Sequence, residues 1–385
     1  MRKLAFPNIA PIALTIALTF GVMSPASAIP VFAHRYGFSC QVCHTVVPHL
    51  TSFGRMFLAN GYRIPGVRPK GAFPIAVRVE SAYASAGAAD PDESSGPLPK
   101  AIVDEVEAFI GGASGSRGSY WVENYFVDGG ESGHLRDAWY ANRLTADGAK
   151  VPVVARIGQF TLPLPLDPET LRETTQPYLI WGQTAGSNPF SFFPAKAGIQ
   201  TEIGDPGRGL AGSLNLIQGR EPGSGLQPNG LDRMLSIERE YGDWTLSAYR
   251  YTGKRQLQGL GYGGTFQVSN VGDSFWRNGY GVSWNHGKNE VDAVYQIGHD
   301  SSADLYHNAL MTSGGFVQVR HELNSRSFAI ARWDATQDAA SQRSITAGLG
   351  VRPRPNMRVT LFETQQRDYL GNLLHIISSS WLFAY

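Results

Sequence analysis

The residues with the clearest chemical potential are the two cysteines of this 385-residue chain, which lie in one string, Cys40-Gln41-Val42-Cys43-His44. Two thiols at this spacing can form thioether bonds to the two vinyl groups of a haem, and the histidine that follows can bind the haem iron. A disulfide, or a zinc site completed by two further ligands, would use the same thiols. Because both thiols stand beside an imidazole, the string favours one covalently bound haem c, with Cys40 and Cys43 as attachment points and His44 as the proximal axial ligand.

A short helix is expected just after this string, opened by Pro48 and closed by Asn60-Gly61. Its apolar residues recur at helical spacing and share one face. They are Leu50, Phe53, Met56 and Phe57. Such a face would shield a haem edge from water, or would pack against protein alone.

The second axial ligand of the haem has three candidates in the sequence. Met56 lies on the apolar face, and its thioether would raise the reduction potential relative to a second histidine. The rivals are His34 and His49, and each of the three residues would also serve as ordinary core or surface. Met56 is the predicted distal ligand.

The first 28 residues have the pattern of a secretory signal peptide. Arg2 and Lys3 supply the positive start, Ile9–Met23 is apolar, and Ala26-Ser27-Ala28 fits the cleavage site. A single membrane anchor helix is the alternative. We therefore expect residues 1–28 to be removed and the mature chain to be exported, in agreement with haem c attachment outside the cytoplasm.

Composition excludes two broad classes of protein. The net charge is +1 and charged residues make up only 17% of the chain, which argues against a nucleic-acid-binding protein. Beyond the N-terminus no run of about 18 apolar residues occurs, so a helical membrane protein is excluded as well. A transmembrane β-barrel remains, because its strands alternate apolar and polar residues and never build such a run.

Residues 73–385 carry this alternation. Ile345 and Leu349, for example, alternate with Thr346 and Arg352, so the first pair would face lipid and the second a lumen. An even number of strands of this kind is typical of outer-membrane barrels, whereas a large soluble β-sandwich is the alternative. The sixteen expected strands span residues 74–85, 102–112, 119–127, 135–144, 151–160, 197–204, 212–219, 232–240, 243–252, 274–285, 289–299, 314–322, 327–335, 342–352, 357–366 and 372–385. The predicted fold class is therefore all-β, an antiparallel barrel of about 16 strands with a short helical haem c segment before it.

Two further features bear on this barrel. The last expected strand ends on outward-facing aromatic residues, Trp381, Phe383 and Tyr385, which barrel-assembly machinery reads. Two long irregular stretches, Thr161–Ala195 and Lys254–Asp273, interrupt the strands, and the first would either fold into the lumen or cap the extracellular side. Residues 29–72 are too few to bury a core of their own, so this monohaem segment is expected in or at the lumen of the barrel formed by residues 73–385.

The string from Phe32 to Tyr62 resembles the haem segment of the fused outer-membrane cytochrome–porin proteins, which include iron(II)-oxidising outer-membrane cytochromes. The matching positions are Cys40-x-x-Cys43-His44, Pro48-x-Leu50, Phe53-Gly54-Arg55, Phe57 and Gly61-Tyr62. The string Ala155–Phe160 is similar to a strand of phosphate-selective-type porins. One departure is Leu58-Ala59-Asn60, where a basic residue is common in the family.

This resemblance implies a function in electron transfer. Electrons from extracellular Fe(II) would pass through the one haem to a periplasmic carrier such as a soluble cytochrome, which would make the chain an Fe(II):cytochrome c oxidoreductase in the outer membrane of a Gram-negative bacterium. Export of electrons to an outside acceptor is one alternative. A passive diffusion porin whose haem segment is a structural plug is another, and a soluble periplasmic β protein with one haem is a third.

Acidic residues at expected lumen positions could attract a hydrated Fe(II) cation. They are Asp104, Glu105, Glu107 and Glu123. The simpler interpretation is an ordinary pore lining, balanced by Arg78, Arg136 and Arg156.

Overall fold

The computed structural model describes residues 31–46, 49–64, 66–67, 75–85, 100–165, 173–219, 230–260, 266–337, 341–354, 356–367 and 371–384. The predicted signal peptide and Pro48 lie outside these residues. None of the helices within them is long and apolar enough to cross a membrane.

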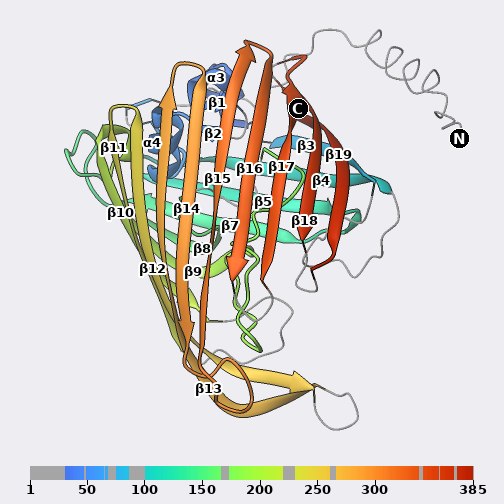
Figure 1. Cartoon of the computed structure of the whole chain (residues 1–385). Helices are drawn as coiled ribbons and strands as arrows, with labels where there is room; N and C mark the ends of the chain where they lie inside the picture. The colour runs from blue at the N-terminus through green and yellow to red at the C-terminus, as the bar shows by residue number, and fades with distance from the viewer. Residues whose placement is uncertain are drawn as a thin grey trace, which may run out of the picture.

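Sixteen long antiparallel strands and the two-residue strand β6 close into one barrel, in which β19 pairs with β3 (Figure 1). The strands are β3 (Ile75–Ala84), β4 (Lys100–Ser114), β5 (Gly118–Asp128), β6 (Glu131–Ser132), β7 (Leu135–Arg143), β8 (Val153–Phe160), β9 (Lys196–Gly204), β10 (Leu210–Gln218), β11 (Leu231–Tyr241), β12 (Trp244–Leu260), β13 (Phe266–His286), β14 (Asn289–Asp300), β15 (Leu310–Asn324), β16 (Ser327–Gln337), β17 (Gln342–Val351), β18 (Met357–Arg367) and β19 (Leu373–Ala384). This confirms the predicted sixteen-stranded all-β barrel and excludes a β-sandwich, which would leave strand edges open.

The alternation in the strands sorts side chains between the outside and the lumen. In β17, Ile345 and Leu349 are 57% and 54% exposed on the outer face, whereas Thr346 is 0% exposed on the inner one. In β10, Leu214 is 44% exposed and its neighbour Asn215 is buried. Apolar residues therefore cover the outer wall and polar residues line the interior, the reverse of a soluble protein.

The two ends of the barrel differ in their connections. At one end the strands are joined by short turns, such as residues 115–117 between β4 and β5 and 242–243 between β11 and β12. At the other end the connections are longer, with residues 161–195 between β8 and β9 the longest. In outer-membrane barrels short turns face the periplasm and long loops face the outside. Figure 1 shows the N-terminal helices at the short-turn end, which is also the end at which the last strand finishes.

One of the two irregular stretches expected from the sequence is mostly strand, so that prediction was wrong. Residues 254–260 continue β12 and residues 266–273 begin β13, with Leu260 paired to Phe266. The ladder shifts register between Gln256 and Gln258, where three residues of β13 lie opposite one residue of β12. The backbone pairing therefore continues through a stretch that was expected to be irregular.

The described part of the other stretch, residues 161–165 and 173–195, folds into the lumen. Trp181, Phe190 and Phe192 are buried, and the Phe192 ring lies 5.3 Å from that of Tyr249 on the inner wall. The Arg332 guanidinium of β16 donates to the carbonyl oxygen of Gln176 at 2.9 Å. Of the two placements left open by the sequence, the inward one is observed.

The chain before the barrel forms three short helices and a small ribbon. They are α2 (Val31–Tyr36), α3 (Cys40–Cys43), β1 (His44–Val46), β2 (His49–Leu50) and α4 (Ser52–Ala59). We call residues 31–46 and 49–64 the N-terminal segment. Its main helix begins at Ser52 rather than at Pro48, because the Thr51 hydroxyl caps it by accepting from the Gly54 amide.

Candidate functional site

The N-terminal segment is tied together around the end of α3. The Thr51 amide donates to the Cys43 carbonyl oxygen at 2.9 Å, and the Thr51 hydroxyl donates to that of Val42 at 2.8 Å. A Cβ atom at Gly54 would lie 2.2 Å from the Cys43 carbonyl oxygen, so only glycine allows α4 to approach this closely. The Phe53-Gly54-Arg55 triplet thus fixes the helix against the predicted attachment site.

An aromatic cluster fills the space between this segment and the barrel wall. On the segment side, Phe38 contacts Phe53 at 5.8 Å between ring centroids, and Phe53 stacks on Phe57 at 6.3 Å. The full cluster comprises Phe32, Tyr36, Phe38, Phe53, Phe57 and Tyr62 of the segment with Phe109, Trp121 and Trp139 of the wall. Burial raises the pKa of the Tyr36 phenol, although the Arg63 charge acts in the opposite direction.

Tyr62 shows how firmly the segment is seated. Its backbone has a φ of 60°, a left-handed conformation that is unusual and costly for a residue with a side chain. The ring is held on the wall, 5.1 Å from Trp121 and 5.5 Å from Trp139 between centroids. These contacts offset the backbone strain.

Charged groups hold the segment to the inner wall along its length. The Arg55 guanidinium pairs with Glu238 at 3.2 Å and with Glu240 at 2.8 Å, both on β11. Further along, Arg143 of β7 donates to the Asn60 side-chain oxygen at 2.7 Å. Other contacts are Ser52 to Glu240, Arg35 to the Gly111 carbonyl, Arg63 to the carbonyls of Gly115, Ser116 and Gly118, and Arg156 to the Leu58 carbonyl.

Glycines in the barrel make room for the segment. A Cβ atom at Gly111 of β4 would lie 2.9 Å from the Phe32 ring, and one at Gly112 would lie 2.2 Å from the Arg35 guanidinium. Because these approaches require glycine on the wall itself, the segment and the barrel fit each other as one structure.

The structure describes some of the predicted haem residues in full and others only by their backbone. Cys40 and Cys43 begin and end α3, one helical turn apart along the backbone, and His44 follows as the first residue of β1. Cys43 is half-buried. The side chains of Cys40, His34 and His49 lie outside the described part of the structure.

Met56 contacts the turn between β9 and β10, because a Cβ atom at Gly207 would lie 3.1 Å from Met56 Cβ. The rings of Phe53 and Phe57, on the same helix, join the aromatic cluster. Distal ligation by Met56 stays a prediction.

These residues fit a covalently attached haem. The donor set is two thiols and an imidazole within five residues of the chain, α4 packs closely on Cys43 at Gly54, and the rings of Phe38 and Phe53 on either side of α3 in the sequence contact each other. A buried aromatic surface is what a haem face needs for shielding from water, because hydrophobic surroundings control its potential. The presence of haem itself remains a prediction.

The acidic positions singled out from the sequence are mostly balanced by arginine. Arg78 pairs with both Glu105 and Glu107, and Arg136 lies 3.7 Å from Glu123. Asp104 is the extra residue of a bulge in β4, between the partners of Glu80 and Ser81.

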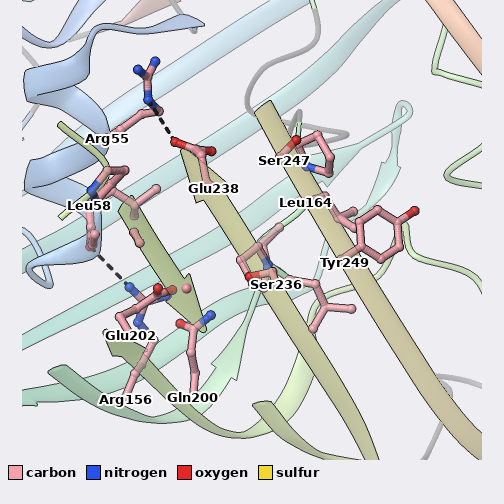
Figure 2. Close-up of a pocket in the computed structure, with 18 of the residues that line it drawn as sticks. Arg55, Leu58, Arg156, Leu164, Gln200, Glu202, Ser236, Glu238, Ser247 and Tyr249 are labelled. Atoms are coloured by element: carbon pink, nitrogen blue, oxygen red, sulfur yellow. Dashed lines mark hydrogen bonds and ion pairs between the residues drawn. The ribbon is translucent and has the colours of Figure 1, made fainter. Parts of the chain in front are cut away.

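A cavity of about 210 Å³ lies between α4 and the inner wall, bordered by β9–β12 (Figure 2). From the segment it is lined by Leu50, Arg55, Leu58, Ala59 and Tyr62. The wall contributes polar residues that the sequence reasoning missed, among them Gln200, Glu202 and Glu238. They occupy inward positions of strands that the sequence predicted, so the alternation of side chains could have shown that they face the lumen. That they meet around one cavity could not be predicted, because it depends on how the strands are arranged in the barrel.

The chain matches no known protein family model, and no curated protein matches its sequence. Its fold, however, is similar to solved porins. An anion-selective porin from Comamonas acidovorans superposes with a TM-score of 0.59 at 10% identity, covering 81% of this chain and 98% of that one. OmpF of Salmonella typhi, solved in complex with daunomycin, gives 0.57 at 12% identity, covering 81% and 97%. The outer-membrane channel DcaP of Acinetobacter baumannii gives 0.55 at 11% identity, covering 81% and 96%.

The share of this chain that the porins cover is informative. A fraction of 81% of 385 residues is about 312 residues, and the predicted barrel of residues 73–385 has 313. The match is therefore as long as the predicted barrel. This chain has the fold of a porin-type outer-membrane β-barrel.

Proposed function

We propose that this chain carries electrons across the outer membrane of a Gram-negative bacterium, through one haem c attached to its N-terminal segment. The favoured donor is extracellular Fe(II), and the acceptor is a periplasmic carrier such as a soluble cytochrome. The observation that supports this most is the anchoring of the N-terminal segment that carries the Cys40–His44 string: α4 packs on Cys43 at Gly54, and Arg55 of the same helix pairs with Glu238 and Glu240 on the inner wall.

A haem bound to Cys40, Cys43 and His44 would supply reversible transfer of one electron. The residues of this chain supply the rest. Phe53 and Phe57 exclude water from the space beside α3, and the ion pairs of Arg55 keep α4 from moving away from β11. Positioning a cofactor and controlling its surroundings is the part of such chemistry that belongs to the protein.

The position along the barrel supports an acceptor in the periplasm. Arg63 donates to the Gly118 carbonyl oxygen at 2.8 Å and to that of Gly115 at 3.1 Å, so the segment contacts the β4–β5 turn. Because short turns of outer-membrane barrels face the periplasm, the segment would lie within reach of a periplasmic partner.

The passive diffusion porin is the second candidate, favoured by the porin fold. Against it, two parts of the chain occupy the lumen: the N-terminal segment near the short turns, and the inward loop with Trp181, Phe190 and Phe192 near the other end. A sixteen-stranded barrel conducts only when its interior leaves an aqueous channel.

We therefore expect the purified protein to show a small fraction of an open porin's conductance in planar lipid bilayers. A variant without residues 29–72 should conduct more, because removing the segment widens the path. Conductance of the complete protein equal to that of an open porin would contradict electron transfer as the main function.

Mixing the oxidised, detergent-purified protein anaerobically with Fe(II) in a stopped-flow instrument tests the proposal directly. We expect rapid appearance of the reduced haem absorbance bands. A haem that stays oxidised with Fe(II), yet is reduced by dithionite, would instead favour electron export or a structural haem.

A further inference from the structure

The cavity beside α4 carries an excess of negative charge. Its lining has four carboxylates and two guanidinium groups. Two charged residues just outside the lining pair with residues of the lining: Glu240 with Arg55, and Arg136 with Glu123. Counting them gives five carboxylates and three guanidinium groups, so the excess of two negative charges is unchanged. The lining groups are Glu123, Asp137, Glu202 and Glu238, with Arg55 and Arg156.

The strand pairing brings like charges together at this place. Glu123 of β5 and Asp137 of β7 are directly paired across the ladder, and both side chains point inward. Like charges directly opposite each other destabilise a sheet. Carboxylates withdrawn from bulk water need compensating positive charge, and Arg136, 3.7 Å from Glu123, supplies part of it.

Two acceptor groups on β9 line the same cavity. Gln200 is 1% exposed, and its side-chain oxygen accepts no hydrogen bond from any described residue. Two residues along the strand, the Glu202 carboxylate interacts electrostatically with Arg156. Figure 2 shows both side chains beside Arg156, with Glu238 across the cavity. A buried oxygen with no donor is unusual, so the site has acceptor capacity to spare.

The geometry favours an ion that keeps its water. Among the described residues no three acidic, histidine or cysteine side chains converge closely enough to chelate a bare metal ion. A cavity of about 210 Å³ has room for several water molecules, and hence for a small cation with part of its hydration shell. Carboxylate, carbonyl and water oxygens are the ligands that hard divalent cations prefer.

We propose that this cavity binds one hydrated divalent metal cation, held by Glu202, Glu238 and the Gln200 side-chain oxygen and by the paired carboxylates of Glu123 and Asp137. The inference deepens the proposed function, since it gives the Fe(II) substrate a place beside α4. The cavity lining includes Leu50, which is paired with His44 in the β1–β2 ribbon.

Equilibrium dialysis of the complete protein in detergent against Mn(II), followed by metal analysis, tests the site. Mn(II) has the charge of Fe(II) and the same preference for oxygen ligands, and it does not depend on a haem for detection. We expect one Mn(II) per chain in the wild type. The double variant Glu202→Gln with Glu238→Gln should bind at least about tenfold more weakly, because two charges near the divalent ion are removed.

Two further variants sharpen the result. Glu80→Gln removes a lumen carboxylate that pairs with Arg358 on another part of the wall, and Mn(II) affinity should be unchanged. Gln200→Glu adds a charge inside the cavity and should strengthen binding about tenfold. This gain keeps the test decisive if the double variant does not fold.

Absence of Mn(II) binding in the wild type would overturn the proposal, because protons or the arginines would then neutralise the carboxylates. Equal binding by the wild type and the double variant would also overturn it, by placing the ion elsewhere. The electron-transfer function fails separately: a haem not reduced by Fe(II), in a protein that still binds Mn(II) in this cavity, would leave the cation site standing without that role.

Discussion

A chain in which Cys40 and Cys43 are both changed to Ala is expected to fold into the same barrel and to carry no covalently bound haem. The thioether bonds need both sulfur atoms, whereas the backbone ladder that closes the barrel runs from β3 to β19 and does not include α3. Haem-specific staining after denaturing electrophoresis should fall from a full signal to none. Heat-modifiable migration in the same gels should be retained, because it reports the closed barrel.

The matched control for this experiment is Met56→Leu, which keeps both thiols and His44. Staining should stay at the wild-type level, while the reduction potential falls if Met56 is the distal ligand, since a thioether ligand raises it. Two results would contradict the proposal: a wild type without covalent haem when produced in a host that matures c-type cytochromes, or a double variant that still stains.

The second large effect is expected from Gly54→Ala. The added Cβ would lie 2.2 Å from the Cys43 carbonyl oxygen, a backbone atom that cannot move without shifting α3. Forcing such a contact costs about 1–3 kcal/mol, which corresponds to roughly 5- to 150-fold in the local opening equilibrium. Hydrogen exchange of peptides from residues 40–59 should accelerate by that factor, and exchange in the barrel strands should not change.

Leu58→Met is the control on the same helix, because it conserves volume and meets no backbone atom. Its exchange should match the wild type. If Gly54→Ala behaved like this control, the close packing of α4 on α3 would be wrong, and so would the argument that the Phe53-Gly54-Arg55 triplet fixes the attachment site.

Much of the fold was predictable because barrel strands sort their side chains with a period of two. All sixteen expected strands are present, and Ile345 and Thr346 face opposite sides as the alternation indicated. The prediction failed in the hairpin of β12 and β13, where the backbone ladder continues across a register shift between Gln256 and Gln258. It also misplaced the start of α4, which was expected at Pro48. The helix begins at Ser52, because the Thr51 hydroxyl accepts from the Gly54 amide and caps it.

The candidate site was predictable only in its local part. Cys40, Cys43 and His44 are adjacent in the chain, so their chemistry can be read from spacing. The cavity is formed by residues far apart in the sequence: Gln200 and Glu238 come from β9 and β11, which meet only through β10. No pattern within one strand shows such a convergence.

The pairing of the first and last strands has a consequence for the order of assembly. Ser81 pairs with Trp381, so the final closure joins residues 300 positions apart, and such a long loop closes slowly. The polar contacts of the N-terminal segment described here are with β4–β11, the half of the barrel that is synthesised first. The segment can therefore act as a template on which that half gathers before the remaining strands arrive.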